Sequence, residues 1–224
     1  MMMSQEAAES ELFSIVVLAK MIPTLHHPRW YQEVGAIDEL AAESAAKSGK
    51  LVCIPPLTQF SVMGFTIACA EERWQIQTEN GDASQKILRV AKIVFEQLHH
   101  TPVSAFGFNF GFHRRLGLDN VGQSLGKIVS QASVGIDDLQ VDAAEWKTKS
   151  PHHDGVASFS VLPSTVAPDM LHVSCNFHYD VKALVGDETL FKLAPLLNER
   201  FDRDRLAAEE RASSIIAAIR GRER

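Results

Sequence analysis

One short segment, residues 103–113, constrains the fold of this chain more than any other. Its phenylalanines recur at every second position: Phe106, Phe108, Phe110 and Phe112. Successive side chains of a β-strand point to opposite faces, so an extended segment places all four rings on one face. Small or polar residues fill the other face, where another molecule can approach the backbone. Four rings need a hydrophobic layer beneath them, and the segment therefore predicts a sheet with one buried face.

The rest of the chain supplies the elements that such a sheet needs. Apolar residues between 82 and 98 lie on one helical stripe, and a second helix is expected at 120–131. Strand-like runs occupy residues 12–21, 51–54, 59–70, 73–78, 139–147, 156–162 and 170–181. We predict an α+β fold with a largely antiparallel sheet and helices packed on the phenylalanine face. The rings of Phe177 and Tyr179 should be buried together with the four phenylalanines.

The aromatic strand has a counterpart in the second half of the chain. Residues 109–113 (Asn-Phe-Gly-Phe-His) and 176–180 (Asn-Phe-His-Tyr-Asp) share an Asn-aromatic-x-aromatic pattern. Each half also combines a hairpin with a helix. The match is either a coincidence between two short strands or the sign of a sheet built from two similar halves.

The C-terminal segment is helical by pattern. From residue 187 the apolar residues are spaced as on one helical face, and Pro195 indicates a kink or a fresh helix start. We predict a sheet domain over residues 1–185 and a long helical extension over residues 186–224 that projects from it. The apolar residues of the extension are candidates for binding a protein partner or a second copy of the chain: Leu206, Ile215, Ile216 and Ile219.

Composition argues against several classes of protein. A net charge of −6 does not provide the basic surface that nucleic-acid binding needs. Three cysteines lie far apart in apolar segments, which is typical of buried, reduced thiols. The apolar run at residues 12–19 is too short to cross a bilayer, and no basic leader precedes it. We therefore expect a soluble, cytoplasmic protein with neither a nucleic-acid nor a membrane partner.

The polar face of the two aromatic strands gathers the residue types that catalysis uses. His178 and Asp180 lie on the same side of one strand, where a carboxylate can orient an imidazole that acts as a base. If the two strands are neighbours, this surface also holds four candidate ligand-binding residues: Asn109, His113, His172 and Asn176. The alternative is the ordinary wet face of an antiparallel sheet, since no serine or cysteine nucleophile stands in a recognisable motif.

Nine histidines raise the question of a metal site. Six of them form adjacent pairs, and neighbours in a strand or helix point in different directions, so a pair chelates poorly. Gly122 and Gly126 precede Lys127, but a phosphate-binding loop needs four residues between the glycines and a serine or threonine after the lysine. The sequence therefore predicts neither a metal site nor a cofactor.

Three fragments, taken together, carry a resemblance to other proteins. Residues 74–78 (Trp-Gln-Ile-Gln-Thr), the amphipathic helix after them and residues 102–110 resemble a sporadically distributed group of uncharacterised prokaryotic proteins. That group has a hairpin, a helix and a strand with an aromatic-Asn element, followed by a strand-rich half and a C-terminal helix. The resemblance spans residues 55–202 and implies the same order of elements here, but it supplies no catalytic residues.

Two functions are consistent with these features. The first is a non-enzymatic subunit or adaptor of a prokaryotic multi-protein assembly, which binds through its sheet face and its C-terminal helix. The absence of a catalytic signature and the apolar end of the helix favour it. The second is a small hydrolase or nucleotide-handling enzyme that uses His178 and Asp180 on the polar sheet face.

Overall fold

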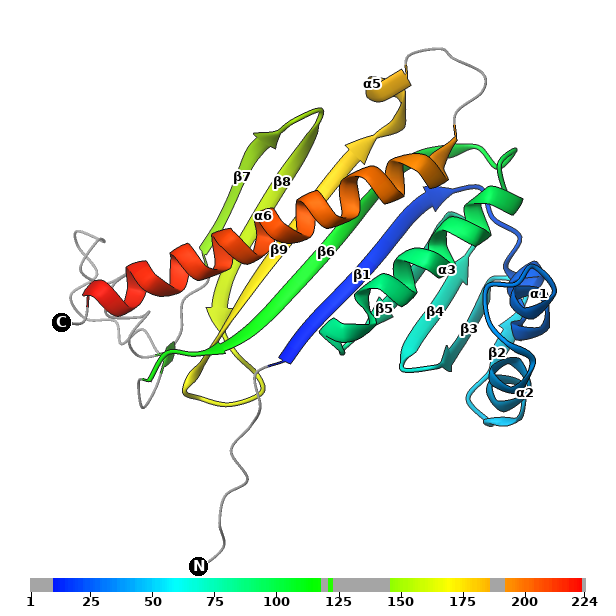
Figure 1. The fold of residues 1–224 in the computed structure, drawn as a ribbon, viewed down its shortest axis with the longest axis horizontal. Coiled ribbons are helices and arrows are strands. Elements are labelled where there is room, and N and C mark those ends of the chain that lie inside the picture. Colours follow the sequence, from blue (N-terminus) through cyan, green and yellow to red (C-terminus); the bar gives the residue numbers. More distant parts are fainter. Residues whose placement is uncertain (1–9, 118–120, 123–145, 186–191, 223–224) are drawn as a thin grey trace, which may run out of the picture.

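The computed structural model describes residues 10–117, 121–122, 146–185 and 192–222 (Figure 1). Its strands form one nine-stranded antiparallel sheet in the order β2-β3-β4-β5-β1-β6-β9-β8-β7. The expected helix at 120–131 lies almost wholly outside the described residues, as does most of the expected strand at 139–147. The α+β fold with an antiparallel sheet is thus confirmed.

Most bounds follow the sequence pattern closely, but β7 continues to His152, beyond the end of the expected strand at residue 147. The strands are β1 (Ser10–Ala19), β2 (Val52–Ile54), β3 (Leu57–Val62), β4 (Phe65–Ala70), β5 (Arg73–Thr78), β6 (Val103–Arg115), β7 (Trp146–His152), β8 (Gly155–Pro163) and β9 (Met170–Asp180). The helices are α1 (Pro28–Glu33), α2 (Glu39–Lys47), α3 (Ser84–Gln97), α5 (Val181–Val185) and α6 (Leu193–Arg222), with single 3₁₀ turns at Pro23–His26 and Gly81–Ala83.

One expected strand is divided in two. The sequence predicted a single strand over residues 59–70, but the chain turns at Met63 and Gly64 to form the β3–β4 hairpin. Both turn residues have positive φ, 51° and 83°, as a two-residue hairpin turn with the twist of the sheet requires. Glycine adopts this conformation freely, whereas methionine rarely does. Only one of the two turn residues is therefore of a type that predicts a hairpin turn from the sequence.

The phenylalanine face is the core of the molecule. The side chains of Phe106, Phe108, Phe110, Phe112, Phe177 and Tyr179 are all at most 1% exposed, as predicted. Phe13 of β1 meets the rings of Phe110 and Phe112 edge-on, at centroid distances of 5.4 and 6.0 Å. Phe201 of α6 covers Phe108 and Phe110 from above, at 5.4 and 5.5 Å. The aromatic layer therefore joins the central strands to the C-terminal helix.

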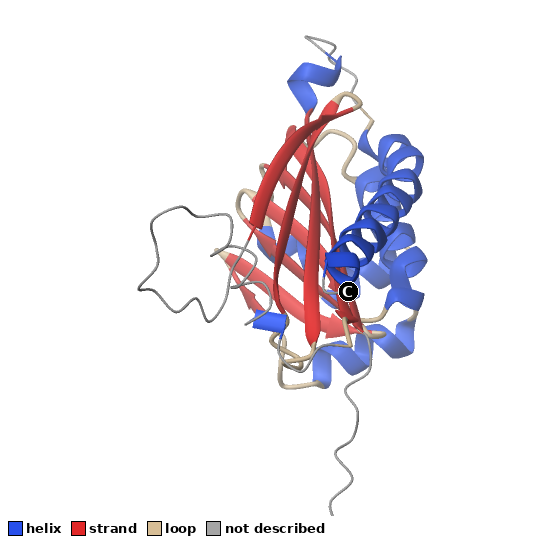
Figure 2. Cartoon of the chain, turned by 90° about the vertical axis from the view of Figure 1, so that its left-hand side faces the viewer, coloured by secondary structure: helices blue, strands red, loops and turns tan. Residues whose placement is uncertain are grey.

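The two long helices lie side by side on this face and leave the other side of the sheet to the strands (Figures 1 and 2). They run antiparallel, because Gln85 near the start of α3 donates to Asp202 of α6 while Lys92 further along donates to Asn198. α1 covers the same face at the β2–β5 end, where its Tyr31 packs on Phe60. Within the described residues, no long helix covers the opposite face, which we call the open face.

The C-terminal helix packs differently from the projecting extension that the sequence predicted. α6 lies across β6 and β9 as Figure 1 shows, and its residues Leu197, Phe201, Ala208, Ala212 and Ile219 belong to the hydrophobic core. Pro195 stands in its first turn, where a proline does not interrupt helical hydrogen bonds. None of the helices in the described part of the chain is long and apolar enough to cross a membrane.

The two halves of the chain repeat one topology. Each begins with a central strand, β1 or β6, and continues with a meander, β3-β4-β5 or β7-β8-β9, whose last strand pairs with that central strand. A long helix, α3 or α6, then crosses the same face. Because β1 pairs antiparallel with β6 and α3 runs antiparallel to α6, the halves are arranged about an approximate twofold axis at the sheet centre. Of the two alternatives that the sequence left open, the arrangement of the elements favours a sheet built from two similar halves.

Substitution of Phe110 by alanine tests the aromatic layer. The ring is fully buried between β1, β9 and α6, so F110A should lower the free energy of unfolding in urea by about 3–5 kcal/mol. The control is L206A on α6, whose side chain is 52% exposed and should change stability by less than about 0.5 kcal/mol. A loss below about 1 kcal/mol for F110A would show that this layer is not the core.

A second buried cluster contains a histidine that must stay neutral. The indole Nε1–H of Trp74 donates to the hydroxyl of Tyr31 at 2.8 Å, and Nδ1 of His26 lies 2.8 Å from the same hydroxyl. His26 is completely buried, and this burial lowers its pKa from 6.5 to about 4. Since the unfolded chain binds the proton first, folding is most favoured above pH 6.5 and loses stability as the pH falls toward 4.

This cluster makes the stability of the protein depend on pH. Between pH 7.5 and 5.0, His26 should account for a loss of about 2 kcal/mol in the free energy of unfolding. Urea denaturation at both pH values should show that loss in the wild type and a correspondingly smaller loss in H26Q. The variant H100Q, at an exposed position, should behave like the wild type. An equal pH dependence in the wild type and H26Q would contradict the assignment.

Candidate functional site

A row of polar side chains crosses the open face, with one residue from each of eight neighbouring strands. The sheet register aligns Ser61, Thr66, Gln77, Ser14, Asn109, Asn176, Ser158 and Lys149. We call this line the polar row. It includes two of the predicted ligand-binding residues, Asn109 and Asn176, which are direct partners across β6 and β9.

The centre of the polar row is held by side-chain hydrogen bonds. The amide nitrogen of Asn176 donates to the amide oxygen of Asn109 at 2.5 Å, and the amide nitrogen of Asn109 donates to the hydroxyl of Ser14 at 2.9 Å. Both hydrogen bonds run in the same direction across the strands, so their dipoles reinforce one another. The arrangement fixes the central rotamers, and on its other side Asn176 is the Cα partner of Ser158 in β8.

Beside the polar row, β7, β8 and β9 form a shallow hollow of about 390 Å³. Its lining is mostly hydroxyl and amide groups, with one lysine and one ring: Thr148, Lys149, Ser158, Phe159, Ser160, Ser174 and Asn176. The hollow thus offers hydrogen-bond donors and acceptors and one positive charge. It is open to solvent, as a surface that binds a macromolecule is, whereas enzyme pockets enclose most of a small ligand.

The other two ligand-binding candidates also meet on the open face. His113 of β6 and His172 of β9 are Cα partners, and their rings stack at a centroid distance of 4.4 Å with 11° between the planes. Nδ1 of His113 lies 2.7 Å from the hydroxyl of Ser164. Burial lowers the pKa of both histidines; Arg114 adds to this effect at His113, and His113 adds to it at His172.

The structure does not assemble the predicted catalytic pair. His178 and Asp180 are both exposed on β9, and no hydrogen bond joins them. The carboxylate of Asp180 instead accepts the backbone N–H of Ala183 at 3.0 Å and so caps the first turn of α5. Since no hydrogen bond joins the two side chains, the carboxylate does not orient the imidazole of His178 as a catalytic base would require.

The partner-binding candidates on α6 lie in unequal surroundings. Ile219 is 4% exposed and belongs to the core, and Ile215 and Ile216 pack against that core. The apolar end of the helix therefore has partners within its own chain, contrary to the reasoning that made these residues candidates. Leu206 is exposed and remains available to a partner.

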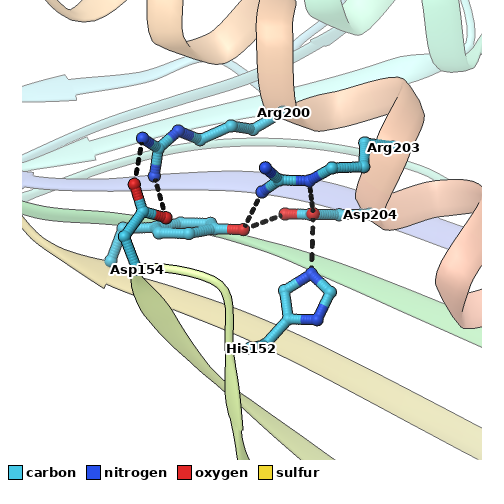
Figure 3. A network of polar contacts seen from close by, with 6 residues as sticks. His152, Asp154, Arg200, Arg203 and Asp204 are labelled. Atoms are coloured by element: carbon cyan, nitrogen blue, oxygen red, sulfur yellow. Dashed lines mark hydrogen bonds and ion pairs between the residues drawn. The ribbon is translucent and has the colours of Figure 1, made fainter.

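A buried polar cluster that the sequence pattern did not predict lies between α6 and the end of the β7–β8 hairpin (Figure 3). Asp204 is fully buried, and its carboxylate accepts the hydroxyl of Tyr179 at 2.6 Å and Nε–H of Arg203 at 3.0 Å. Nε2 of His152 lies 3.0 Å from the same carboxylate. Burial, followed by the negative charge of Asp204, raises the pKa of Tyr179. The phenol therefore stays protonated as a hydrogen-bond donor.

A bidentate ion pair lies beside this cluster. The guanidinium of Arg200 donates to both carboxylate oxygens of Asp154 at 2.7 and 2.5 Å, and its carbon lies 4.6 Å from the ring centroid of Tyr179. Burial opposes ionisation of Asp154, but Arg200 outweighs it and holds the pKa of the carboxyl below its usual value. The pair fastens the hairpin turn to α6.

The sequence does contain a signal for this cluster. Leu197, Phe201 and Ala208 form the apolar stripe of α6, and Asp204 occupies the position between the last two. A carboxylate on an apolar stripe needs buried donors, which here come from Tyr179 and Arg203. The partners could not be identified without knowing how α6 lies on the sheet.

Other reactive groups are either buried or scattered. Burial raises the pKa of the Cys69 and Cys175 thiols to about 12, so both remain protonated and unreactive near neutral pH. Within the described residues, no group of three or more His, Cys, Asp or Glu side chains converges to hold a metal ion.

Comparison with known proteins assigns no relative. No protein-family model matches the chain, and no curated protein matches its sequence.

Replacement of Asp204 by asparagine tests whether the buried cluster holds α6 on the sheet. The variant removes the charge that pairs with Arg203, so that guanidinium loses its ionic partner and keeps its hydrogen bond to the hydroxyl of Tyr179. Because Arg203 is 32% exposed, the loss should fall near or below the low end of the range for buried pairs, at about 2–3 kcal/mol in urea denaturation. D202N, on the exposed side of α6, should cost less than about 1 kcal/mol. Equal effects of the two variants would show that the cluster does not stabilise the fold.

Proposed function

We propose that this chain is a non-enzymatic, cytoplasmic subunit or adaptor of a prokaryotic multi-protein assembly, and that it binds a protein partner through the open face. The observation that carries the proposal is the one-sided architecture. Both long helices pack on the phenylalanine face, while the opposite face carries the polar row, of which only Ser14 is buried, beside an open hollow. The prokaryotic part of the proposal is supported by the resemblance to a group of prokaryotic proteins with the same order of elements.

The dimensions of the open face support a macromolecular partner. Eight inter-strand spacings of about 4.8 Å make the nine-stranded sheet roughly 38 Å wide. A partner contributes about 800 Å² to a standard protein interface. Contact along about six residues of each strand, at about 3.3 Å per residue, reaches that area.

The chemistry of the face supports specific but reversible binding. Its polar row consists of amides and hydroxyls with one lysine at the β7 end, so it offers many hydrogen bonds and little net charge. Such a surface remains soluble without a partner and gains direction from hydrogen bonds when a partner covers it. Leu206, the exposed one of the predicted contact residues on α6, lies on the helix side of the sheet and adds no contact to a partner on the open face.

The proposal can be tested with one substitution on each side of the sheet. N176R places a long charged side chain in the polar row, while R89E changes a charge on the exposed side of α3. Wild-type, N176R and R89E proteins are immobilised and exposed to lysate of the source organism, and bound proteins are quantified by mass spectrometry. A partner should be retained by the wild type and R89E and reduced at least tenfold by N176R.

Folding and oligomeric state complete this test. Circular dichroism and urea denaturation must show that N176R is folded, and light scattering of the wild type separates a second copy from a different partner. Retention of the same proteins by N176R would contradict binding through the open face. If the wild-type protein is a monomer and retains no lysate protein above the background of the empty resin, the adaptor function itself is contradicted.

A further inference from the structure

The strand β7 forms one edge of the sheet (Figure 1), and within the described residues no strand pairs with its outer side. The β7–β8 hairpin fixes which of its backbone groups point outward. His152 and Gly155 flank a two-residue turn, and such a pair exchanges both backbone hydrogen bonds. Paired and outward-facing residues then alternate along β7, so the N–H and C=O groups of Lys149 point away from the sheet. Pro151 also stands in an outward position, where its missing N–H costs no bond to β8.

A positive charge stands on each side of this edge. On the open face, the exposed side chain of Lys149 ends the polar row. On the helix side, the guanidinium carbon of the exposed Arg211 lies 5.3 Å from the ring centroid of Phe159, whose Cα partner in β7 is Thr148. Within the described residues, neither Lys149 nor Arg211 has a carboxylate partner. In a chain of net charge −6, the β7 edge is therefore locally positive on both faces.

These charges select the kind of strand that can pair with the edge. A second copy of the chain, joined through β7, would place two Lys149 side chains on the same face of adjoining strands, where like charges repel. Asp154 and Asp204 lie near the edge, but both already pair with arginines of α6. An acidic strand meets the opposite condition, because each of two carboxylates finds a cation that the described part of the chain leaves without one.

The alternation of side chains along a strand specifies the acidic segment further. Adjacent residues of a strand point to opposite faces. An incoming strand therefore needs one acidic residue beside Lys149 on the open face. The next residue in its sequence lies beside Thr148, where a second carboxylate can meet Arg211 on the helix side.

We infer that the β7 edge binds an extended segment of the protein partner by strand addition, and that this segment carries two consecutive acidic residues. Backbone hydrogen bonds to Lys149 supply affinity, and the two charge pairs select the segment. The inference rests on the proposed function as an adaptor and describes one part of the partner, in addition to the surface that covers the open face.

A synthetic peptide tests this binding directly. The probe is the fluorescein-labelled peptide Thr-Val-Thr-Glu-Glu-Val-Thr-Val, and its binding to the full chain is followed by fluorescence anisotropy at low salt. The binding should be saturable, and a peptide with Lys-Lys in place of Glu-Glu should bind at least tenfold more weakly. Two further versions carry N-methyl groups on one or the other set of alternate backbone amides. Only one of them should lose binding, because only one set of amides faces β7.

Variants of the chain locate the site. K149E and R211E should each weaken binding of the Glu-Glu peptide at least tenfold, and K149E should regain affinity for a peptide in which one glutamate is replaced by lysine. R89E, which reverses an exposed charge on α3, should bind like the wild type. N176R should bind the peptide at least as well as the wild type, since β8 separates Asn176 from β7. Failure of strand addition is therefore distinguishable from failure of open-face binding, which N176R tests in lysate.

Four results would overturn the inference: no binding at millimolar peptide, equal binding of the Glu-Glu and Lys-Lys peptides, equal binding of the two N-methylated versions, or equal effects of K149E and R89E. A wild-type dimer in light scattering that excludes the peptide would assign the edge to a second copy and would overturn it as well. Circular dichroism confirms that each variant is folded, and the comparisons between peptides on the wild type need no variant.

Discussion

The fold depends on the burial of one aromatic layer between the central strands and α6. Phe108 and Phe110 project from β6 toward the ring of Phe201, and Phe13 supports them from β1. Each such side chain contributes roughly 1.5–3 kcal/mol by leaving water, more than any single surface contact in the molecule. Because strand residues alternate between faces, burial of these rings also decides which residues stand on the open face. The alternation of aromatic with small or polar residues along the central strands therefore determines both the core and the residues of the candidate site.

This alternation explains how much of the fold the sequence could predict. The period of two in residues 106–112 identifies the buried face without knowledge of the strand order, because it is a local property of the chain. The shared pattern at Asn109 and Asn176 left open whether the two strands are neighbours, and the pairing of β6 with β9 makes these residues direct partners. Local periodicity therefore carried information about tertiary structure where both strands were strongly patterned.

The remaining features depend on contacts between distant segments, which no local pattern specifies. Asp204 is the polar exception on the stripe of α6, but its donors come from β9 and from α6 itself, so the cluster exists only once the helix is docked. Ile219 looked unpartnered because the path of α6 over the sheet was unknown. The stacking of His113 on His172 requires both the strand order and the register. The sequence shows only histidine pairs that are adjacent along the chain, whereas the stacked pair on the sheet, His113 and His172, comes from residues far apart in sequence.

The two faces of β9 connect the helix side of the molecule to the open face. Tyr179 points toward α6 and binds the buried carboxylate of Asp204, while Asn176 and His172 point to the opposite side of the same strand. A buried ion cluster contributes little net stability compared with an apolar contact of the same size, but it penalises misalignment because each unpaired group is costly. Correct docking of α6 therefore favours the same position of β9 that its pairing with β6 specifies. That position in turn aligns the amides of the polar row and the two imidazole rings, so the register of the open face is maintained from the buried side.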